Sequence, residues 1–381
     1  MTELPIVFSR PFRAPRELQY LDEVLASGHV HGDGAYTARA SRLLSGWLGD
    51  RPVLLTSSGT HALEMCSLLL DIGPGDEVVI PSFTFSSAAT AITQFGGIPV
   101  FVDSEPLTGN VDPERLAEAI GPRTKAISIV HYGGVAVDMS AVNDVASRYG
   151  LPVIEDNAHG FGAKLNGAST GTLGTLAIQS FHDTKNIHSG EGGAIVINDS
   201  RFLSRAEILR EKGTDRAKFL RGQVDKYTWT DKGSSYLMSE LSAAVLLAQL
   251  EHADKIQLLR ETVWLSYRDS LQEWASSVGA RLMTIPDGRT QPSHLFAVHM
   301  PSRQAQQELL DWTRRNGVHC TFHYVPLDSS PAGERYGRRH QECQVAADFA
   351  SRLVRLPLWA GMGHEQVARV VDVVRRFRPG A

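Results

Sequence analysis

The stretch of sequence that decides the fold is Ser180-Phe181-His182-Asp183-Thr184-Lys185-Asn186, followed closely by Gly190-Glu191-Gly192-Gly193-Ala194. The apolar run before it, residues 176–178, and the run after its glycines, residues 194–197, predict two buried strands joined by a polar segment. A lysine between two buried strands is unusual, because burial of an ammonium group is costly unless another group neutralises or uses it. Two interpretations of Lys185 are open at this point. It is either an ordinary surface-loop lysine or an amine with a lowered pKa that attacks a carbonyl group to form a Schiff base.

Length and composition limit the class of protein. The chain has 381 residues, of which 42% are hydrophobic and 21% charged, typical of a folded protein with a large domain and a smaller one. Its net charge of −4 gives no bulk attraction to nucleic acid or to anionic lipid, so neither is expected as a partner. Three cysteines without a C-x-x-C pair predict neither a disulfide framework nor a metal site. The N-terminus has no signal-peptide pattern and no apolar run reaches about 18 residues, so we expect a cytoplasmic protein.

Short apolar runs alternate with amphipathic segments of about ten residues through the first half of the chain. The predicted strands are 53–55, 78–80, 98–102, 126–130, 153–156, 176–178 and 194–197. The predicted helices are 16–27, 36–48, 61–70, one ending near 94, 113–120, 138–149 and 202–210. This alternation predicts an α/β fold with a mostly parallel sheet covered on both faces. Polar residues collect just after the strands, where open α/β sheets bind their ligands.

The second half of the chain begins with a charged segment, residues 211–233. A segment of this length inside a compact domain is more often functional than not, and a solvated surface excursion is the alternative. One continuous helix is predicted from about residue 239 past residue 264, bridging to a second region. That region is expected to hold strands near 294–299 and 321–324 and a helix at 304–316, and to close with the run 353–358 and a helix at 364–376. We place the domain boundary near residue 250.

Residues with complementary chemistry follow the predicted strands, in an order that suits the binding of one ligand. Ser58, Gly59 and Thr60 begin a predicted helix, where free N–H groups and small hydroxyls form an anion site. An ordinary helix N-cap is the alternative for this turn. Phe85 offers a flat apolar face, unless it is a core residue, and Asp156 ends a predicted strand.

Pyridoxal phosphate requires such a set: a cradle for its phosphate, a face for its ring, a lysine for its aldehyde and a carboxylate that keeps its ring nitrogen protonated. A carboxylate beside a pyridinium stays ionised, because the opposite charge lowers its pKa. Ser180 and Lys185 complete the series. The order therefore predicts a pyridoxal phosphate site and favours the Schiff-base interpretation of Lys185.

Further motifs support this interpretation. They are Gly32-Asp33-Gly34, LLDIGPGDEV (69–78), Pro81-Ser82-Phe83-Thr84-Phe85, Ile154-Glu155-Asp156, EKGTDR (211–216), RGQVDKYTW (221–229), GSSYLMSEL (233–241) and His323-Tyr324, beside SFHDTKN and GEGGA themselves. Over nearly the whole chain, the sequence resembles the nucleotide-sugar aminotransferases, which are pyridoxal phosphate enzymes of fold type I. Within them it resembles most the dTDP-4-amino-4,6-dideoxygalactose transaminases, and RGQVDKYTW is the segment most specific to that subgroup.

The resemblance implies an aspartate-aminotransferase-like fold. It implies a three-layer α/β/α large domain over 1–250 that binds the coenzyme, a smaller α/β domain over 251–381, and a homodimer with the active site at the subunit interface. Lys185 would form the Schiff base and move the proton, Asp156 would pair with the ring nitrogen, and His159 would lie near the 3-oxygen of the coenzyme. The phosphate would be held by Ser58, Gly59, Thr60 and Ser180, with Phe85 stacked on the ring.

The resemblance also implies a substrate. L-glutamate would give its amine and leave as 2-oxoglutarate, and a nucleotide-linked 4-keto-6-deoxy sugar, dTDP-4-keto-6-deoxy-D-glucose, would become the 4-amino-4,6-dideoxy sugar. A diphosphate needs cations and a base needs a stacking partner. The candidate substrate-binding residues are Asp33, His182, Arg221, Lys226, Tyr227, Trp229, His323 and Tyr324.

The chain departs from many of these relatives at Ser235 and Leu237, where they carry Asn and Arg, so a cross-subunit phosphate contact at Ser235 is not carried over. Three alternatives stay open. They are transfer to the 3-position, transfer to another keto-sugar such as a 4-keto-pentose, and a non-catalytic binding module on the same fold. A related dehydratase branch has histidine in place of the Schiff-base lysine, and Lys185 argues against it.

Overall fold

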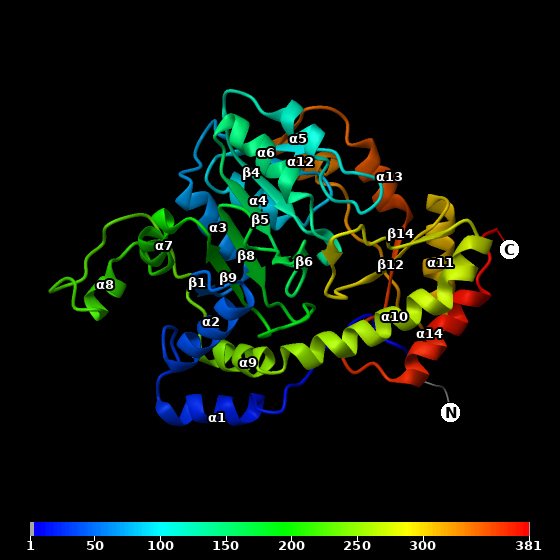
Figure 1. The fold of residues 1–381 in the computed structure, drawn as a ribbon, viewed down its shortest axis with the longest axis horizontal. Helices are drawn as coiled ribbons and strands as arrows, with labels where there is room; N and C mark the ends of the chain where they lie inside the picture. The colour runs from blue at the N-terminus through cyan, green and yellow to red at the C-terminus, as the bar shows by residue number, and fades with distance from the viewer. Residues whose placement is uncertain (1–3, 381) are drawn as a thin grey trace.

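The computed structural model describes residues 4–380 and is built around one large sheet (Figure 1). In spatial order its strands are β1 (Val53–Thr56), β9 (Gly193–Ile197), β8 (Leu176–Ser180), β5 (Val153–Asp156), β4 (Thr124–Val130), β2 (Glu77–Pro81), β3 (Ile98–Val102) and β13 (Arg338–Arg339). The neighbours from β8 to β13 pair in parallel, whereas β9 runs antiparallel to both β1 and β8. The predicted α/β class and mostly parallel sheet are confirmed.

Both faces of the sheet are covered, as the strand sequences require. Successive side chains of a strand point to opposite faces, and in β2 Val78 and Ile80 join the core on one face while Val79 joins the core on the other. The first face carries α3 (Gly59–Leu69), α4 (Ser87–Thr93) and α7 (Leu203–Arg210). The second carries α5 (Pro113–Ala119), α6 (Met139–Tyr149), α1 (Glu17–Ser27), α2 (Ala35–Trp47) and α9 (Glu240–Leu250). The strands therefore read as nearly continuous apolar runs, because both their faces are buried.

A second core lies in the C-terminal region. It is formed by a three-stranded sheet and long helices: β10 (Arg281–Leu282), β12 (Phe296–His299), β14 (Leu353–Leu356), α10 (Ala253–Ser277), α11 (Arg303–Arg315) and α14 (His364–Arg376). The N-terminal segment reaches this core, since Ile6 is buried in it and forms a parallel bridge with Val318. The division of the chain at residue 250 stays a prediction.

The remaining elements are short. They are β6 (Lys164–Leu165), β7 (Ala168–Ser169), β11 (Arg289–Thr290), α8 (Arg216–Leu220), α12 (Pro331–Tyr336), α13 (Gln344–Arg352) and three 3-10 turns at Tyr132–Gly134, Ser200–Phe202 and Leu327–Ser329. No helix within residues 4–380 is long and apolar enough to cross a membrane.

Two sequence-based predictions of elements were wrong. The helix expected to continue past residue 239 is interrupted: α9 ends at Leu250, and His252 leaves the helical conformation before α10 begins. The strand expected at 321–324 is reduced to a single bridge between Thr321 and Arg355. Such interruptions depend on how the two regions pack together. A local apolar pattern therefore does not predict them.

Residues 211–233, here called the arm, extend away from the body of the molecule and include α8 (Figure 1, left). The helix α8 buries none of its residues, and Trp229 is 78% exposed. The base of the arm is held by an ion pair between Arg205 of α7 and Asp231 (2.8 Å). The arm therefore projects an aromatic and cationic surface away from its own chain's core.

Candidate active site

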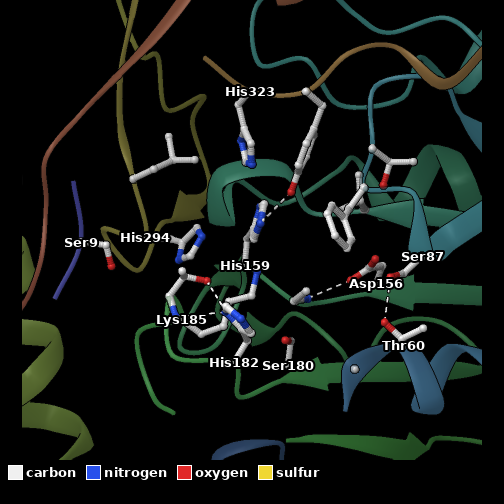
Figure 2. Close-up of a pocket in the computed structure, with 18 of the residues that line it drawn as sticks. Ser9, Thr60, Ser87, Asp156, His159, Ser180, His182, Lys185, His294 and His323 are labelled. Carbon is white, nitrogen blue, oxygen red and sulfur yellow. Dashed lines mark hydrogen bonds between the residues drawn. The ribbon is translucent and has the colours of Figure 1, made fainter. Parts of the chain in front are cut away.

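A cavity of about 310 Å³ lies past the carboxyl ends of β5 and β8, beside the C-terminal sheet (Figure 2). It is lined by most of the residues that the sequence singled out. These are Ser58, Gly59, Thr60, Phe85, Asp156, His159, Ser180, His182, Lys185, His323 and Tyr324. Lys185 therefore faces a cavity and is not an ordinary surface-loop residue.

The turn before α3 is open to an anion. The Ser58 hydroxyl accepts a hydrogen bond from the His61 N–H (3.0 Å) and so caps the helix. The N–H groups of Gly59 and Thr60 form no hydrogen bond with any described residue. A β-carbon at Gly59 would lie 3.0 Å from that of Ser180, so glycine allows the two segments to meet. The turn is thus an N-cap and, at the same time, a helix start with free N–H donors, which suits a phosphate.

The carboxylate of Asp156 ends β5 on the floor of the cavity. Its Oδ1 accepts a hydrogen bond from the Ala158 N–H (3.0 Å), and the side chain is buried without a cation at ion-pair distance in the described chain. Burial raises its pKa, while the Ala158 hydrogen bond and the charge of Lys185 act in the opposite direction. A protonated ring nitrogen placed against this carboxylate would supply the missing positive charge.

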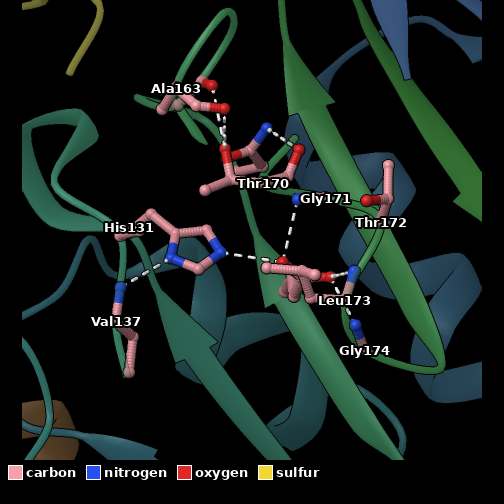
Figure 3. A network of polar contacts seen from close by, with 12 residues as sticks. His131, Val137, Ala163, Thr170, Gly171, Thr172, Leu173 and Gly174 are labelled. Atoms are coloured by element: carbon pink, nitrogen blue, oxygen red, sulfur yellow. Dashed lines mark hydrogen bonds and ion pairs between the residues drawn. The ribbon is translucent and has the colours of Figure 1, made fainter. Parts of the chain in front are cut away.

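Asp156 is held in place by its neighbour. Glu155 is fully buried and accepts four hydrogen bonds, from the N–H groups of Gly171 (2.8 Å), Leu173 (2.6 Å) and Gly174 (2.5 Å) and from His131 Nε2 (2.8 Å). Figure 3 shows these donors around the carboxylate. Because His131 Nδ1 accepts from the Val137 N–H (3.0 Å), its hydrogen is on Nε2 and points at Glu155.

Lys185 lies in the loop between β8 and β9, with its N–H bonded to the His182 carbonyl (2.9 Å). Burial lowers the pKa of its amine to about 8; the Asp156 carboxylate raises it and the charge of Arg355 lowers it further. A lysine with such a pKa is unprotonated far more often at neutral pH than an exposed one. This is the property that a nucleophilic amine needs.

Two neutral histidines line the cavity together with Lys185. The rings of His159 and His294 stack with centroids 4.3 Å apart, and burial lowers the pKa of both well below the usual value. His159 Nδ1 accepts from the Gly133 N–H (3.2 Å), so its Nε2 carries the hydrogen and meets the Tyr324 hydroxyl (3.2 Å). His159 can therefore donate but not take up a proton readily.

The other histidine has the opposite arrangement. Asn186 donates from Nδ2 to the Pro292 carbonyl (2.7 Å) and to Gln257 (2.8 Å), which directs its Oδ1 to His294 Nδ1 (3.0 Å). His294 Nδ1 therefore carries the hydrogen, and its Nε2 is left as an acceptor. The cavity thus contains one imidazole donor and one imidazole acceptor side by side.

The structure does not bring every candidate to this cavity. Asp33 instead pairs with Arg210 (2.7 Å), and Arg221 pairs with Glu207 (2.7 Å). Neither lines the cavity, nor do Lys226, Tyr227 and Trp229, which lie in the arm. None of these five residues therefore contributes to the cavity of its own chain.

Other residues line the cavity without having been predicted: Phe8, Ser9, Thr84, Ser87, Arg260, His294 and Arg355. Ser87 bonds to Thr60 through their hydroxyls (2.7 Å). Both arginines of this set stand out in the sequence. Arg260 interrupts the apolar face of α10, and Arg355 lies within the apolar run Leu353–Leu356. A charged residue in a buried pattern is a candidate for function.

Phe85 is not a core residue, because it is 55% exposed while lining the cavity. Its ring lies 5.9 Å from that of Tyr324. The residues present therefore fit pyridoxal phosphate on four points: open helix N–H groups beside Ser180, an unpaired buried carboxylate, an amine of lowered pKa and an aromatic ring at the mouth.

Known proteins resemble this chain in sequence. Residues 12–375 match the model of the DegT/DnrJ/EryC1/StrS aminotransferase family. The chain is 35% identical over 317 residues to UDP-2-acetamido-2-deoxy-3-oxo-D-glucuronate aminotransferase of Pseudomonas aeruginosa (83% of both chains). It is 35% identical over 279 residues to GDP-perosamine synthase of Caulobacter vibrioides (73% of both).

The structure agrees with these matches. DesV of S. venezuelae, solved with a ketimine intermediate, superposes with a TM-score of 0.88 at 29% identity over 98% of each chain. The expected fold type I and pyridoxal phosphate dependence are thereby confirmed. The protein is a pyridoxal-phosphate-dependent aminotransferase and belongs to the DegT/DnrJ/EryC1/StrS aminotransferase family.

Proposed function

We propose that this enzyme, a nucleotide-sugar aminotransferase, transfers the amino group of L-glutamate to the 4-keto carbon of a nucleotide-linked 6-deoxy sugar, with dTDP-4-keto-6-deoxy-D-glucose as the substrate. The observation that carries the transfer chemistry is that Lys185, whose pKa is lowered to about 8, lines the same cavity as the buried carboxylate of Asp156. The segment RGQVDKYTW (221–229) supports the choice of a 4-keto sugar, through its resemblance to the 4-aminotransferases.

When bound, pyridoxal phosphate supplies an electron-accepting ring that stabilises negative charge on the amine-bearing carbon. Asp156 would hold the ring nitrogen protonated. Gly59, Thr60 and Ser180 would hold the phosphate, the first two through the open start of α3. Lys185 Nζ, whose pKa is lowered to about 8, would take the proton from the amine-bearing carbon and return it at the neighbouring position.

The surrounding rings set the orientation of the reacting groups. His159 donates from Nε2 to the Tyr324 hydroxyl, which leaves the hydroxyl hydrogen of Tyr324 free to point into the cavity. Burial raises the pKa of Tyr324 well above its usual value, so this group remains a donor at all working pH values. We assign Tyr324, whose hydroxyl is oriented by His159, to a hydrogen bond with the coenzyme or the substrate, and neither residue to proton abstraction.

The nucleotide contacts are assigned to a homodimer. Arg221, Lys226, Tyr227 and Trp229 are exposed or lie in the arm, away from their own cavity. A second copy of the chain would bring this cationic and aromatic surface to the neighbouring site, where it would bind diphosphate and base. Asp33, in its pair with Arg210 near the start of α2, would lie at the same interface.

A second candidate is transfer to a 3-keto sugar. It is favoured by the name of the relative from Pseudomonas aeruginosa, which acts on a 3-oxo sugar and is 35% identical to this chain. A 4-keto-pentose is a further alternative for the same chemistry.

A panel of nucleotide keto-sugars tests the proposal. The purified protein, loaded with pyridoxal phosphate, is incubated with L-glutamate and each sugar, and the formation of 2-oxoglutarate is followed. The expected result is the highest kcat/KM with dTDP-4-keto-6-deoxy-D-glucose and an amine at carbon 4 in the product by NMR. A higher kcat/KM with a 3-keto sugar would replace the proposal by the second candidate. A protein that gains no visible absorbance band with pyridoxal phosphate would instead be a binding module.

A further inference from the structure

We propose that a second cavity of the protein binds a phosphate group, either as the free ion or as the end of a small phosphomonoester. This cavity, here called the basic pocket, has a volume of about 150 Å³. Its polar lining comes from Arg281 of β10, His299 of β12, and Asp348 and Arg352 of α13. Among the described residues, the basic pocket and the coenzyme cavity share none. The inference therefore goes beyond the proposed function and does not depend on which sugar the enzyme aminates.

The basic pocket lies where the C-terminal sheet meets the large sheet. Successive side chains of β12 point to opposite faces. Phe296 and Val298 belong to the C-terminal core, whereas Ala297 belongs to the core on the first face of the large sheet. His299 shares the orientation of Ala297, and its ring lies 4.1 Å from that of Phe349 in α13, which belongs to the same core as Ala297. The imidazole therefore points away from the C-terminal core and toward the large sheet.

Two arginines supply positive charge to the pocket. Arg281 donates to the carbonyls of Pro106 (2.9 Å) and Leu107 (3.1 Å), in the loop that follows β3, and its Nε has no hydrogen-bond partner within residues 4–380. Arg352 pairs through Nη2 with Asp348, one turn earlier in α13 (2.5 Å), and its Nε and Nη1 form no hydrogen bond within the same range. Asp348 is the one carboxylate among the described residues that line the pocket, so two cations face one anion.

His299 is a buried polar group without a partner. It is 8% exposed, and neither nitrogen of its ring forms a hydrogen bond with any residue that the structure describes. Burial and the charges of Arg281 and Arg352 lower the pKa of His299 to about 3. The ring is therefore neutral, carries one N–H and lies in a positive potential. Because a buried donor without an acceptor costs free energy, an anion in the pocket would accept this hydrogen bond and offset the charge of the arginines.

The size of the pocket and the directions of its donors favour phosphate. Sites for drug-sized ligands have volumes of about 300–1,000 Å³, so a whole nucleotide is too large for a pocket of about 150 Å³. The donors come from three separate elements, β10, β12 and α13. A tetrahedral oxyanion has an oxygen for each of them, whereas a carboxylate has two oxygens in one plane. Arginine forms strong charge-assisted hydrogen bonds with phosphate, and a phosphate group bound here would join the three elements.

Calorimetric titration with inorganic phosphate tests the inference. The protein is used in its coenzyme-loaded form, so that the phosphate turn before α3 is filled, and chloride keeps the ionic strength constant. R352Q removes one charged donor and should raise the Kd for phosphate by roughly 10- to 100-fold. D348N removes the competing carboxylate and frees Arg352, so it should lower the Kd by roughly fivefold. The side chains of both residues are partly exposed, so both variants should fold.

Arg376 and Asp372 of α14 provide a matched control. They form an exposed pair with the same spacing along a helix (3.1 Å) and do not line the basic pocket. R376Q and D372N should leave the Kd for phosphate within about twofold of wild type. The midpoint of thermal unfolding gives an independent readout, because a ligand that binds the folded state stabilises it. Phosphate should raise this midpoint in wild type and D348N, but little in R352Q.

Two further anions identify the ligand. Glycerol 3-phosphate carries its phosphate at the end of a small molecule. If it binds at least as tightly as inorganic phosphate, the ligand is a phosphomonoester, and if it binds more weakly, the ligand is the free ion. Acetate should bind roughly tenfold more weakly than phosphate, because its two oxygens cannot meet donors from three elements.

Three results would overturn the inference. One is a Kd for phosphate that is equal in wild type, R352Q and D348N. Another is acetate binding as tight as that of phosphate, which would remove the preference for a tetrahedral anion. The third is the absence of phosphate binding by the wild-type protein.

Discussion

Replacing Glu155 with glutamine tests how much the buried carboxylate next to Asp156 contributes to the stability of the fold. Oε1 of Glu155 accepts hydrogen bonds from the N–H groups of Leu173 and Gly174, and Oε2 accepts from Gly171 and from His131. Glutamine has an amide NH2 in place of one of these oxygens. Whichever way the amide turns, it points a donor at two other donors, and the negative charge is lost as well.

The size of the effect follows from those contacts. A hydrogen bond to a charged group contributes about 1.5–3 kcal/mol, so the loss of two predicts a decrease in the free energy of unfolding of about 3–6 kcal/mol. This is a large part of the total stability of a typical domain, which is about 5–15 kcal/mol. Glu155 has no exposed surface, so water cannot take over the unpaired donors.

Urea-induced unfolding of the coenzyme-free protein measures the effect in wild type, E155Q and the control E118Q. Glu118 is exposed and pairs with Arg115 on one helix, so its substitution should change the free energy of unfolding by less than about 0.5 kcal/mol. The expected order of midpoints is wild type and E118Q together, with E155Q well below. A decrease for E155Q below about 1 kcal/mol would refute the view that the four donors depend on a buried charge.

Three further predictions concern the cavity. With a pKa of about 8, Lys185 is neutral in roughly a tenth of molecules at pH 7. The rate of pyridoxal phosphate uptake, followed by absorbance, should therefore rise with pH and level off above about pH 9. A rate that still rises at pH 10 would contradict the lowered pKa. A β-carbon at Gly193 would lie 2.4 Å from the Ser58 carbonyl carbon, so G193A should weaken coenzyme affinity, whereas G46A, with open space around it, should not. D156N should keep the visible band but lose roughly 100-fold in kcat; an unchanged kcat would remove Asp156 from the ring nitrogen.

The sequence predicted the parts of the site that follow one another along the sheet. Asp156, Ser180 and Lys185 lie at the ends of neighbouring strands or just beyond them, and strand order follows from an apolar pattern that both faces of a buried sheet impose. The phosphate turn was recognisable for a similar reason, because a small-residue turn at a helix start is a local feature.

The other half of the cavity was not predictable in this way. Phe8, Arg260, His294 and Arg355 come from four separate segments, and only tertiary packing brings them to one wall. The break between α9 and α10 has the same origin, since apolar periodicity runs through it. Arg260 and Arg355 nonetheless stood out as charges in apolar runs, which is the kind of inconsistency that functional sites produce.

The arm has a consequence for how such enzymes diversify. None of the residues 211–233 belongs to the four apolar clusters that hold the described chain together. Substitutions in its exposed part, such as the helix α8 and Trp229, should leave the free energy of unfolding nearly unchanged, because surface positions outside the core contribute little to it. Mutations can therefore accumulate in this part of the arm without the loss of stability that limits change in the cavity. If the arm binds the nucleotide sugar of a neighbouring subunit, as proposed, new sugar preferences can evolve on an unaltered catalytic scaffold.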